Sequence, residues 1–196
     1  AFIQVAESGE NSIVLARGAN AHLDEKLVRH SEAKIAQSNY LLMQLETPIS
    51  GVELAAKIAQ ENGVKVVLNP APARDLSDTL LSMIDIITPN ETEAEILTGV
   101  RVSDEQSALQ AAQVFHKKGI DCVMITLGEK GVFVSQNGET RIINGFRVKA
   151  VDTTAAGDTF NGGFVTALLE GQSFENAVRF GQAAAAISVT RKGAQP

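Results

Sequence analysis

Short apolar runs alternate with amphipathic stretches along most of this chain, and this alternation constrains the fold more than any other feature of the sequence. The apolar runs are nearly continuous, as expected of strands that are buried on both faces of a parallel sheet. They cover residues 40–45, 64–68, 84–88 and 122–127. Stretches with helical spacing cover residues 24–38, 50–62, 76–83, 91–98, 103–118, 158–170 and 174–190. Repeated strand–helix–strand units predict an α/β fold, in which helices flank a mostly parallel sheet.

Turn signals predict two hairpins outside this alternation. Ser8-Gly-Glu-Asn11 separates short strand patterns at 2–6 and 12–17. Asn137-Gly138 joins the strand patterns at 132–134 and 140–143. No low-complexity linker or internal repeat interrupts the chain, so we expect a single domain over residues 1–196.

Cap signals predict where two of the helices begin. Asp24 is expected to cap the helix at 24–38, and Ser50 with Glu53 has the spacing of a capping box. Polar residues also end the buried strands, namely Glu46, Asn69 and Asn90. Because ligands in α/β folds bind at the carboxyl ends of the strands, these side chains are expected along one binding edge of the sheet.

The segment from Asp152 to Phe160 predicts an anion site. Its two aspartates flank a run of small residues, and a helical pattern begins at Asp158. Small residues let the backbone approach a ligand closely, and the free N–H groups of a helix N-terminus attract anions. A carboxylate beside those amides can act as a base. The alternative is an ordinary helix N-cap with a glycine-containing loop.

Composition narrows the class of protein. The 196 residues are 44% hydrophobic and 20% charged with a net charge of −6, which argues against a nucleic-acid footprint. Cys122 is the only cysteine and lies in an apolar run, so we expect a buried thiol, no disulfide and no cysteine-based zinc site. No apolar run is long enough to span a membrane and no signal peptide is present, which favours the cytoplasm. Both ends look cut, so we expect a partial chain.

Six motifs in order along the chain resemble those of the ribokinase-like (PfkB) sugar kinases, and of their ribose-phosphorylating members most of all. They are LLMQLE (41–46), NPAPAR (69–74), TPNETEAE (88–95), ITLGEKG (125–131), DTTAAGDTFNGGF (152–164) and VTRKGAQP (189–196). The resemblance covers the whole chain. It implies a three-layer αβα fold with a small remnant of a β lid at the N-terminus. It also implies ATP and a sugar as ligands, Mg²⁺ and K⁺ as cofactors, and a homodimer formed through the lid.

The resemblance assigns the chemistry to the glycine-containing segment. Asp158 is implied to be the general base that takes the proton from the 5-hydroxyl of D-ribose as that oxygen attacks the γ-phosphate of ATP. The backbone N–H groups of Ala155, Ala156 and Gly157 are implied to form an anion hole. The family commonly has glycine where Ala155 stands, a change that a backbone donor tolerates. Glu46 is implied to bind sugar hydroxyls, whereas from its position alone it could be a paired or solvent-facing strand end.

The nucleotide is implied to lie along three further parts of the chain. Asn90 and Glu93 match an Asn-x-x-Glu motif, although the same pair has the spacing of a capping box. Gln182 matches a nucleotide-contacting position, and its alternative is a solvated helix face. The remaining contacts are implied for the loop Thr126, Leu127, Gly128, Glu129, Lys130 and Gly131, which could also be a simple turn between strands.

Two cation sites follow from the same resemblance. Glu93 is implied to bind Mg²⁺ through water. The monovalent-cation loop is implied to use Asp152, Thr154, Ser188, Arg191 through its carbonyl, and Gly193, with one more ligand after Pro196. Gly18-Ala-Asn20 resembles part of another family motif in the wrong order, so we interpret it as a loop. His22, His30 and His116 lack metal-ligand spacing and are expected at the surface.

The resemblance also predicts what this chain lacks. The family's first strand and its Gly-Gly-Lys-Gly-Ala-Asn loop, which hold the sugar, are absent from the 196 residues. We therefore predict that this chain does not phosphorylate ribose by itself. Two alternatives stay open: a related kinase acting on fructose, deoxyribose or a nucleoside, and a non-catalytic sensor of sugar or nucleotide on the same fold.

Overall fold

The computed structural model describes residues 2–5, 11–14 and 16–195. Contacts divide the chain into two compact units. The first comprises residues 1–16, 128–132 and 143–196, and the second comprises residues 17–127 and 133–142. Most of the hairpin turn predicted at 8–11 lies outside the described residues. The single domain stays a prediction, because compact units of one chain can belong to one domain or to two.

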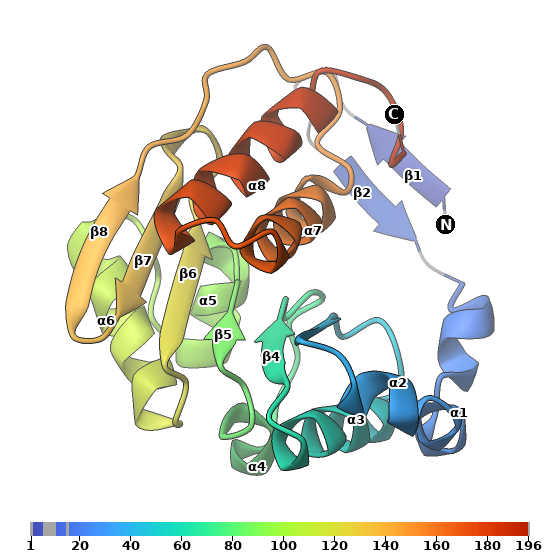
Figure 1. Ribbon diagram of the computed structural model, residues 1–196. Coiled ribbons are helices and arrows are strands. Elements are labelled where there is room, and N and C mark those ends of the chain that lie inside the picture. The colour runs from blue at the N-terminus through green and yellow to red at the C-terminus, as the bar shows by residue number, and fades with distance from the viewer. Residues whose placement is uncertain (1, 6–10, 15, 196) are drawn as a thin grey trace. The chain divides into compact units, whose positions relative to one another are not determined.

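The main sheet has six strands in the order β3-β4-β5-β6-β7-β8 (Figure 1). Neighbouring strands from β3 to β6 pair in parallel, and Leu68 of β4 lies opposite Met43 and Ile87. The strands are β3 (Tyr40–Met43), β4 (Lys65–Leu68), β5 (Ile86–Ile87), β6 (Cys122–Thr126), β7 (Val132–Gln136) and β8 (Glu139–Ile143). This arrangement confirms the predicted α/β sheet.

The central strands of the sheet are buried on both faces. Because successive side chains of a strand point to opposite faces, Val66 and Leu68 join one core cluster while Val67 between them is equally buried. The helices α3 (Ile49–Glu61), α5 (Glu91–Thr98) and α6 (Glu105–Lys117) contribute to that cluster largely through alanines. Small side chains allow these helices to approach the sheet closely.

Two strands differ from their predicted form. The strand predicted at 40–45 is only half-buried, because β3 is the end strand of the sheet and Leu42 is 38% exposed. The strand predicted at 84–88 is reduced to β5. The N–H of Ile84 still belongs to the preceding turn and donates to the Leu81 carbonyl at 3.1 Å, and Pro89 has no N–H to donate to a neighbouring strand.

The first predicted helix is divided in the structure. Residues 24–38 form α1 (Glu25–His30) and α2 (Glu32–Ala36), which are separated at Ser31. The predicted cap is confirmed, because the Asp24 carboxylate accepts a hydrogen bond from the Leu27 N–H at 3.1 Å. The segment before it, Gly18–His22, is a 3₁₀ helix (η1) and not the expected loop.

The predicted capping box of Ser50 and Glu53 is wrong. Helix α3 begins at Ile49 with Pro48 in the cap position, and no side chain caps it. The φ of Pro48 is already −56°, so the proline ring presets the turn into the helix without a cap. The Glu53 carboxylate accepts a hydrogen bond from the Ser77 hydroxyl at 2.9 Å instead.

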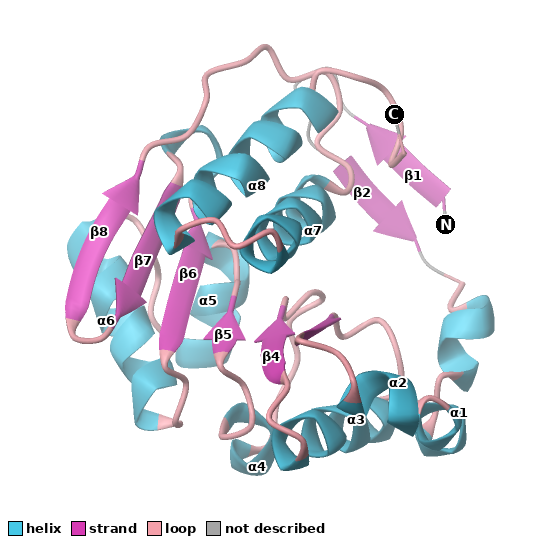
Figure 2. Ribbon diagram, in the orientation of Figure 1, coloured by secondary structure: helices cyan, strands magenta, loops and turns pink. Residues whose placement is uncertain are grey.

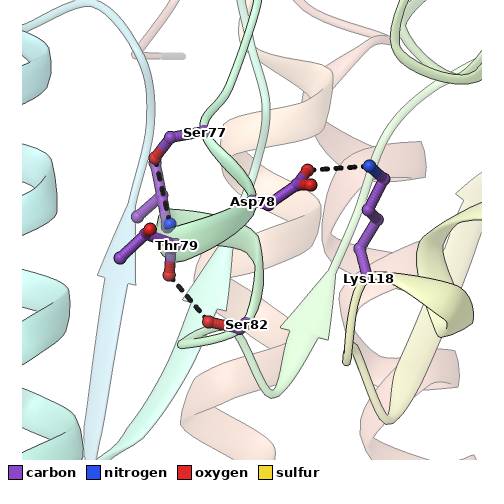
Figure 3. Close-up of polar contacts among 6 residues, drawn as sticks. Ser77, Asp78, Thr79, Ser82 and Lys118 are labelled. Atoms are coloured by element: carbon purple, nitrogen blue, oxygen red, sulfur yellow. Dashed lines mark hydrogen bonds and ion pairs between the residues drawn. The ribbon is translucent and has the colours of Figure 1, made fainter.

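A short helix, α4 (Asp78–Leu81), connects β4 to β5 and is fixed by polar contacts (Figure 3). The Ser77 hydroxyl accepts a hydrogen bond from the Leu80 N–H at 3.1 Å at one end. At the other end the Ser82 hydroxyl donates to the Thr79 carbonyl at 2.9 Å. Lys118, which follows α6, forms an ion pair with Asp78 at 2.7 Å.

The first unit contains a two-stranded antiparallel sheet and a helix pair (Figure 2). Its elements are β1 (Phe2–Val5), β2 (Asn11–Val14), α7 (Ala156–Leu169) and α8 (Phe174–Ser188). Phe164 of α7 stacks on Phe160 and meets Phe174 edge-on. Gly181 of α8 allows the close approach, because a Cβ there would lie 2.6 Å from the Phe160 carbonyl oxygen. No helix in the described part of the chain is long and apolar enough to cross a membrane.

Candidate active site

The segment before α7 presents backbone N–H groups. Ala155 precedes the helix with a left-handed φ of 59°, and α7 begins at Ala156, two residues earlier than predicted. The N–H of Ala156 donates to the Thr153 carbonyl at 3.2 Å, which occupies one of the three predicted anion-hole donors. The N–H groups of Ala155 and Gly157 have no acceptor among the described residues. Two donors of the predicted anion hole are therefore available at this helix N-terminus.

Asp158 lies in the first turn of α7, next to these donors. The side chain is exposed, yet the surrounding protein desolvates it enough to raise the pKa of its carboxyl above the usual value for aspartate. A raised pKa makes the ionised carboxylate of Asp158 a better proton acceptor. The arrangement can bind an anion and remove a proton from a neighbouring hydroxyl.

Asp152 holds together the loop before α7 and the turn after α8. Its carboxylate accepts hydrogen bonds from the N–H groups of Thr154 and Gly193, both at 3.0 Å. The N–H of Asp152 in turn donates to the Val189 carbonyl at 3.2 Å. Hydrogen bonds from the Thr154 hydroxyl, the Gly193 N–H and the Thr154 N–H lower the pKa of this buried carboxyl.

The structure thus brings together the residues predicted to form the monovalent-cation loop. Ser188 lies at the end of α8, and its carbonyl accepts a hydrogen bond from the Arg191 N–H at 3.0 Å. The Ser188 hydroxyl is buried and has no hydrogen-bond partner among the described residues. A buried oxygen without a partner is costly, so an additional ligand at this point would be favourable.

Gln182 does not lie on a solvated helix face, so that alternative is wrong. Its side chain is only 7% exposed, and its Nε2 donates to the Ile143 carbonyl at 2.8 Å. Its Oε1 is buried without a partner among the described residues. Gln182 therefore has an acceptor to offer, and helical periodicity alone could not show this because β8 had to be positioned first.

The glycines of the predicted nucleotide loop are required by the backbone. Residues Gly128–Lys130 form a 3₁₀ turn (η2), and the Gly131 N–H donates to the Gly128 carbonyl at 3.1 Å. Gly131 has a φ of 111°, and a Cβ there would overlap the Ile143 carbonyl and the Gly145 nitrogen. The loop is a turn between two strands, as the simpler interpretation predicted. Its other members, Thr126 and Leu127, belong to the second unit.

Asn90 and Glu93 form a capping box at the start of α5. The Asn90 side chain accepts from the Glu93 N–H at 2.8 Å, and the Glu93 carboxylate accepts from the Asn90 N–H at 2.9 Å. Burial raises the pKa of the Glu93 carboxyl, and the hydrogen bond from Asn90 opposes part of that rise. Asn90 also forms an isolated parallel bridge with Thr126, so two predicted nucleotide contacts are neighbours. The capping role is compatible with ligand binding at this helix N-terminus.

Asn69 and Glu46, the polar residues that follow β4 and β3, form hydrogen bonds with residues distant in the sequence. The Asn69 amide donates to the Thr88 carbonyl at 3.0 Å and thereby ties β4 to the segment before α5. The Glu46 carboxylate receives a hydrogen bond from the Asn20 amide at 3.5 Å. No local pattern connects Asn20 with Glu46, since the two residues lie 26 positions apart in the sequence.

Two other sequence expectations concern titratable side chains. Cys122 is buried as predicted, and desolvation raises the pKa of its thiol to about 12. His116 is not a surface residue: it is half-buried, with its Nδ1 2.8 Å from the Ile120 carbonyl and its Nε2 2.8 Å from the Ser135 hydroxyl. Among the described residues, no group of three or more His, Cys, Asp or Glu side chains could hold a metal ion directly.

The fold is that of an α/β protein, and the N-terminus of α7, with its free N–H groups beside a carboxylate of raised pKa, can bind an anion. Residues 1–196 match the model of the pfkB family of carbohydrate kinases. The chain belongs to this pfkB family of carbohydrate kinases.

Individual relatives agree with the family match. The chain is 78% identical over 195 residues to a ribokinase from Haemophilus influenzae, covering 100% of this chain and 64% of that protein. It resembles a solved ribokinase from Thermotoga maritima with a TM-score of 0.86 and 41% identity, over 99% of this chain and 64% of the other. A ribokinase from Arabidopsis thaliana, solved with ribose and ATP, gives a TM-score of 0.86 and 34% identity, over 98% and 63% of the two chains.

These similarities confirm the predicted ribokinase-like α/β fold. The chain spans about 64% of the length of the Haemophilus relative.

Proposed function

We propose that this chain is part of an ATP-dependent sugar kinase that phosphorylates D-ribose at O5 and yields ribose 5-phosphate. The observation that supports this most is the pairing of Asp158, with its raised pKa, with the free N–H groups of Ala155 and Gly157. The family membership supports a sugar as the acceptor. The similarity to ribokinases, at up to 78% identity, supports ribose as that sugar.

In the proposed step, the sugar O5 attacks the γ-phosphorus of ATP while the bond between that phosphorus and the bridging oxygen of ADP breaks. Asp158 accepts the proton of the 5-hydroxyl. The N–H groups of Ala155 and Gly157 donate to the phosphoryl oxygens, where negative charge must be held in the transition state. General-base help is worth roughly 10²–10⁴ in rate, so positioning and charge stabilisation supply the remainder.

The other predicted residues bind the two substrates in this proposal. Glu46 accepts hydrogen bonds from sugar hydroxyls. Asn90, Gln182 and the loop at 126–131 bind ATP, with the buried Gln182 Oε1 as an acceptor for a nucleotide N–H or hydroxyl. The nucleotide residues are distributed over both units, and the proposal for them rests on the family motifs.

Two cations complete the proposed site. Magnesium bound to the nucleotide would neutralise phosphate charge, and Glu93 would hold one of its waters, because one carboxylate oxygen already accepts from the Asn90 N–H. Potassium would be held at the loop of Asp152, Thr154, Ser188, Arg191 and Gly193. The unpartnered Ser188 hydroxyl supports that choice, since it supplies a buried neutral oxygen. By the same resemblance we propose a homodimer formed through the β1–β2 sheet.

The test uses the protein at the full length of its relatives, with D-ribose, 2-deoxyribose, fructose and adenosine as acceptors and ATP as donor. We expect ADP release with ribose at the highest kcat/KM, and ribose 5-phosphate as the product. Asp158→Asn should lower kcat by roughly 10²–10⁴ with ribose and ATP still bound. A higher kcat/KM with another acceptor would show that ribose is not the preferred substrate. A wild-type level of activity in Asp158→Asn would contradict the proposed base.

A further inference from the structure

The Glu46 carboxylate has one hydrogen-bond partner among the described residues, and that partner is Asn20. Glu46 follows β3 and is half-buried, so its charge needs a donor. The Asn20 Nδ2 lies 3.5 Å from Glu46 Oε2, at the outer limit of a hydrogen bond. Hydrogen bonds of catalytic sites are often long before the substrate binds and shorten in the complex.

The position of Asn20 is fixed by the backbone of η1 and not by its side chain. Its N–H donates to the Arg17 carbonyl at 3.0 Å, and its carbonyl accepts from the Leu23 N–H at 3.3 Å. Its side-chain amide caps no helix, because η1 has Arg17 in the cap position without any side-chain hydrogen bond. The amide of Asn20 is therefore available for Glu46.

Gly51 permits a close approach between the chain after η1 and the first turn of α3. Gly51 lies in the first turn of α3, shortly after Glu46, and is buried. A Cβ on Gly51 would overlap the Leu23 carbonyl, so the chain leaving η1 passes directly against this helix turn. Leu23 immediately follows η1 and α3 shortly follows Glu46, so this contact joins the two segments that carry Asn20 and Glu46.

We propose that Asn20 is a positioning residue of the sugar site, which holds Glu46 Oε2 so that the other carboxylate oxygen accepts a hydrogen bond from a sugar hydroxyl. This inference rests on the proposed function. A neutral amide suits the role, since it fixes the carboxylate without neutralising it, whereas a lysine or arginine would compete with the sugar for the charge. The effect is expected in sugar binding, because Glu46 is the residue proposed to accept hydrogen bonds from sugar hydroxyls.

The test measures sugar and ATP kinetics of Asn20→Ala in the protein at the full length of its relatives. The sugar KM should rise about tenfold, as expected when a charged acceptor loses its donor, with kcat and the ATP KM changed by less than about twofold. His22→Ala is the matched control, because His22 lies exposed in the same 3₁₀ helix and forms no hydrogen bond or ion pair with Glu46 among the described residues. It should leave the sugar KM unchanged.

A double-mutant cycle separates positioning from a structural role. In a Glu46→Gln background, Asn20→Ala should change the sugar KM by less than about twofold, because the two substitutions remove one interaction. Additive effects would contradict the inference. If Asn20→Ala does not fold, Asn20→Ser provides the same loss, since its hydroxyl is too short to reach Glu46.

Asn20→Asp adds a readout by pH. Two facing carboxylates repel at neutral pH, so the sugar KM should exceed that of Asn20→Ala. In acid, a proton shared by the two carboxylates lets the introduced aspartate donate to Glu46, so the ratio of the sugar KM to that of the wild type should decrease. An unchanged sugar KM in Asn20→Ala, with active wild-type enzyme, overturns the role of Asn20 alone. Absence of turnover with every sugar in the wild type overturns the proposed function and this inference together.

Discussion

The carboxylate of Asp152 accepts a hydrogen bond from the backbone N–H of Gly193, 41 residues later in the sequence, at 3.0 Å. Together with the bond from the Thr154 N–H, this contact fixes the loop before α7 to the turn after α8. A single side chain thus sets the position of the amides proposed to hold the phosphoryl group. The geometry of the anion site therefore depends on a residue that need not touch the anion.

Asp152→Asn should lower the midpoint of thermal unfolding at pH 7, because an asparagine turns an N–H donor toward one of the two backbone N–H groups. The hydrogen bonds lower the pKa of the folded carboxyl, so its stabilisation is present above the ordinary aspartate pKa of about 3.9 and is lost as the pH falls through the lower folded value. Differential scanning calorimetry at several pH values should show the difference between the variants shrinking only in strong acid. A difference that disappears near pH 6 would contradict this cause.

The ionised Asp158 carboxylate is expected to lower the stability of the fold, whereas the Asp152 carboxylate raises it. Desolvation raises its folded pKa, so the ionised side chain costs stability above that pKa and the cost fades as the pH falls through it. Asp158→Asn should therefore be at least as stable as the wild type at pH 7 while losing activity. The pH profile of kcat/KM should have an acid limb above the ordinary aspartate pKa of about 3.9. A lower unfolding midpoint for Asp158→Asn would show that the carboxylate is structurally required.

The sequence predicted those parts of the site that depend on local pattern. The capping box of Asn90 and Glu93, the sheet and the start of a helix near Asp158 all follow from spacing within a few residues. The left-handed conformation of Ala155 does not, because alanine disfavours it and the surrounding loop must impose it.

Contacts between segments that are distant in the sequence could not be predicted either, because local spacing carries no information about them. Leu42 is exposed because β3 is at the end of the sheet, which the apolar run at 40–45 cannot reveal. The buried Gln182 donates to the Ile143 carbonyl, and Asn20 contacts Glu46 where the chain at Leu23 passes close to Gly51. Each of these features depends on the strand order or on a close approach between segments, and the periodicity of apolar residues reveals neither.

Gln182→Leu tests the unpartnered oxygen of Gln182. The substitution removes the hydrogen bond to the Ile143 carbonyl, worth about 0.5–1.5 kcal/mol, and also removes the desolvated Oε1. These effects oppose each other, so the free energy of unfolding should change little. If a nucleotide satisfies Oε1, the ATP KM should rise roughly tenfold with the sugar KM unchanged. Steady-state kinetics of the protein at the full length of its relatives tests this expectation. An unchanged ATP KM would show that Gln182 does not contact the nucleotide.

Gly131→Ala and Gly128→Ala separate two reasons for glycine in one loop. Both positions have positive φ, but a Cβ at 128 meets nothing within 4 Å, whereas a Cβ at 131 overlaps the Ile143 carbonyl. Gly128→Ala should cost about 1–2 kcal/mol of unfolding free energy, the left-handed penalty alone. Gly131→Ala should cost clearly more, or prevent folding, because backbone must move. Urea unfolding of both variants provides the comparison, and equal costs would mean that the turn relaxes freely.

His116, which was expected at the surface, is half-buried and bridges two segments of the chain, whereas the nearby Lys118 forms an exposed ion pair. Because the Ile120 carbonyl can only accept, Nδ1 of His116 is the donor there, and in the neutral ring Nε2 then accepts from the buried Ser135 hydroxyl. His116→Ala leaves both groups without this partner and should cost about 1–3 kcal/mol. Lys118→Ala removes an ion pair with the largely exposed Asp78 and should cost less than about 1 kcal/mol. Urea unfolding at neutral pH measures both. If the two variants lost equal stability, the bridge from α6 to β7 through His116 would contribute no more than an exposed ion pair.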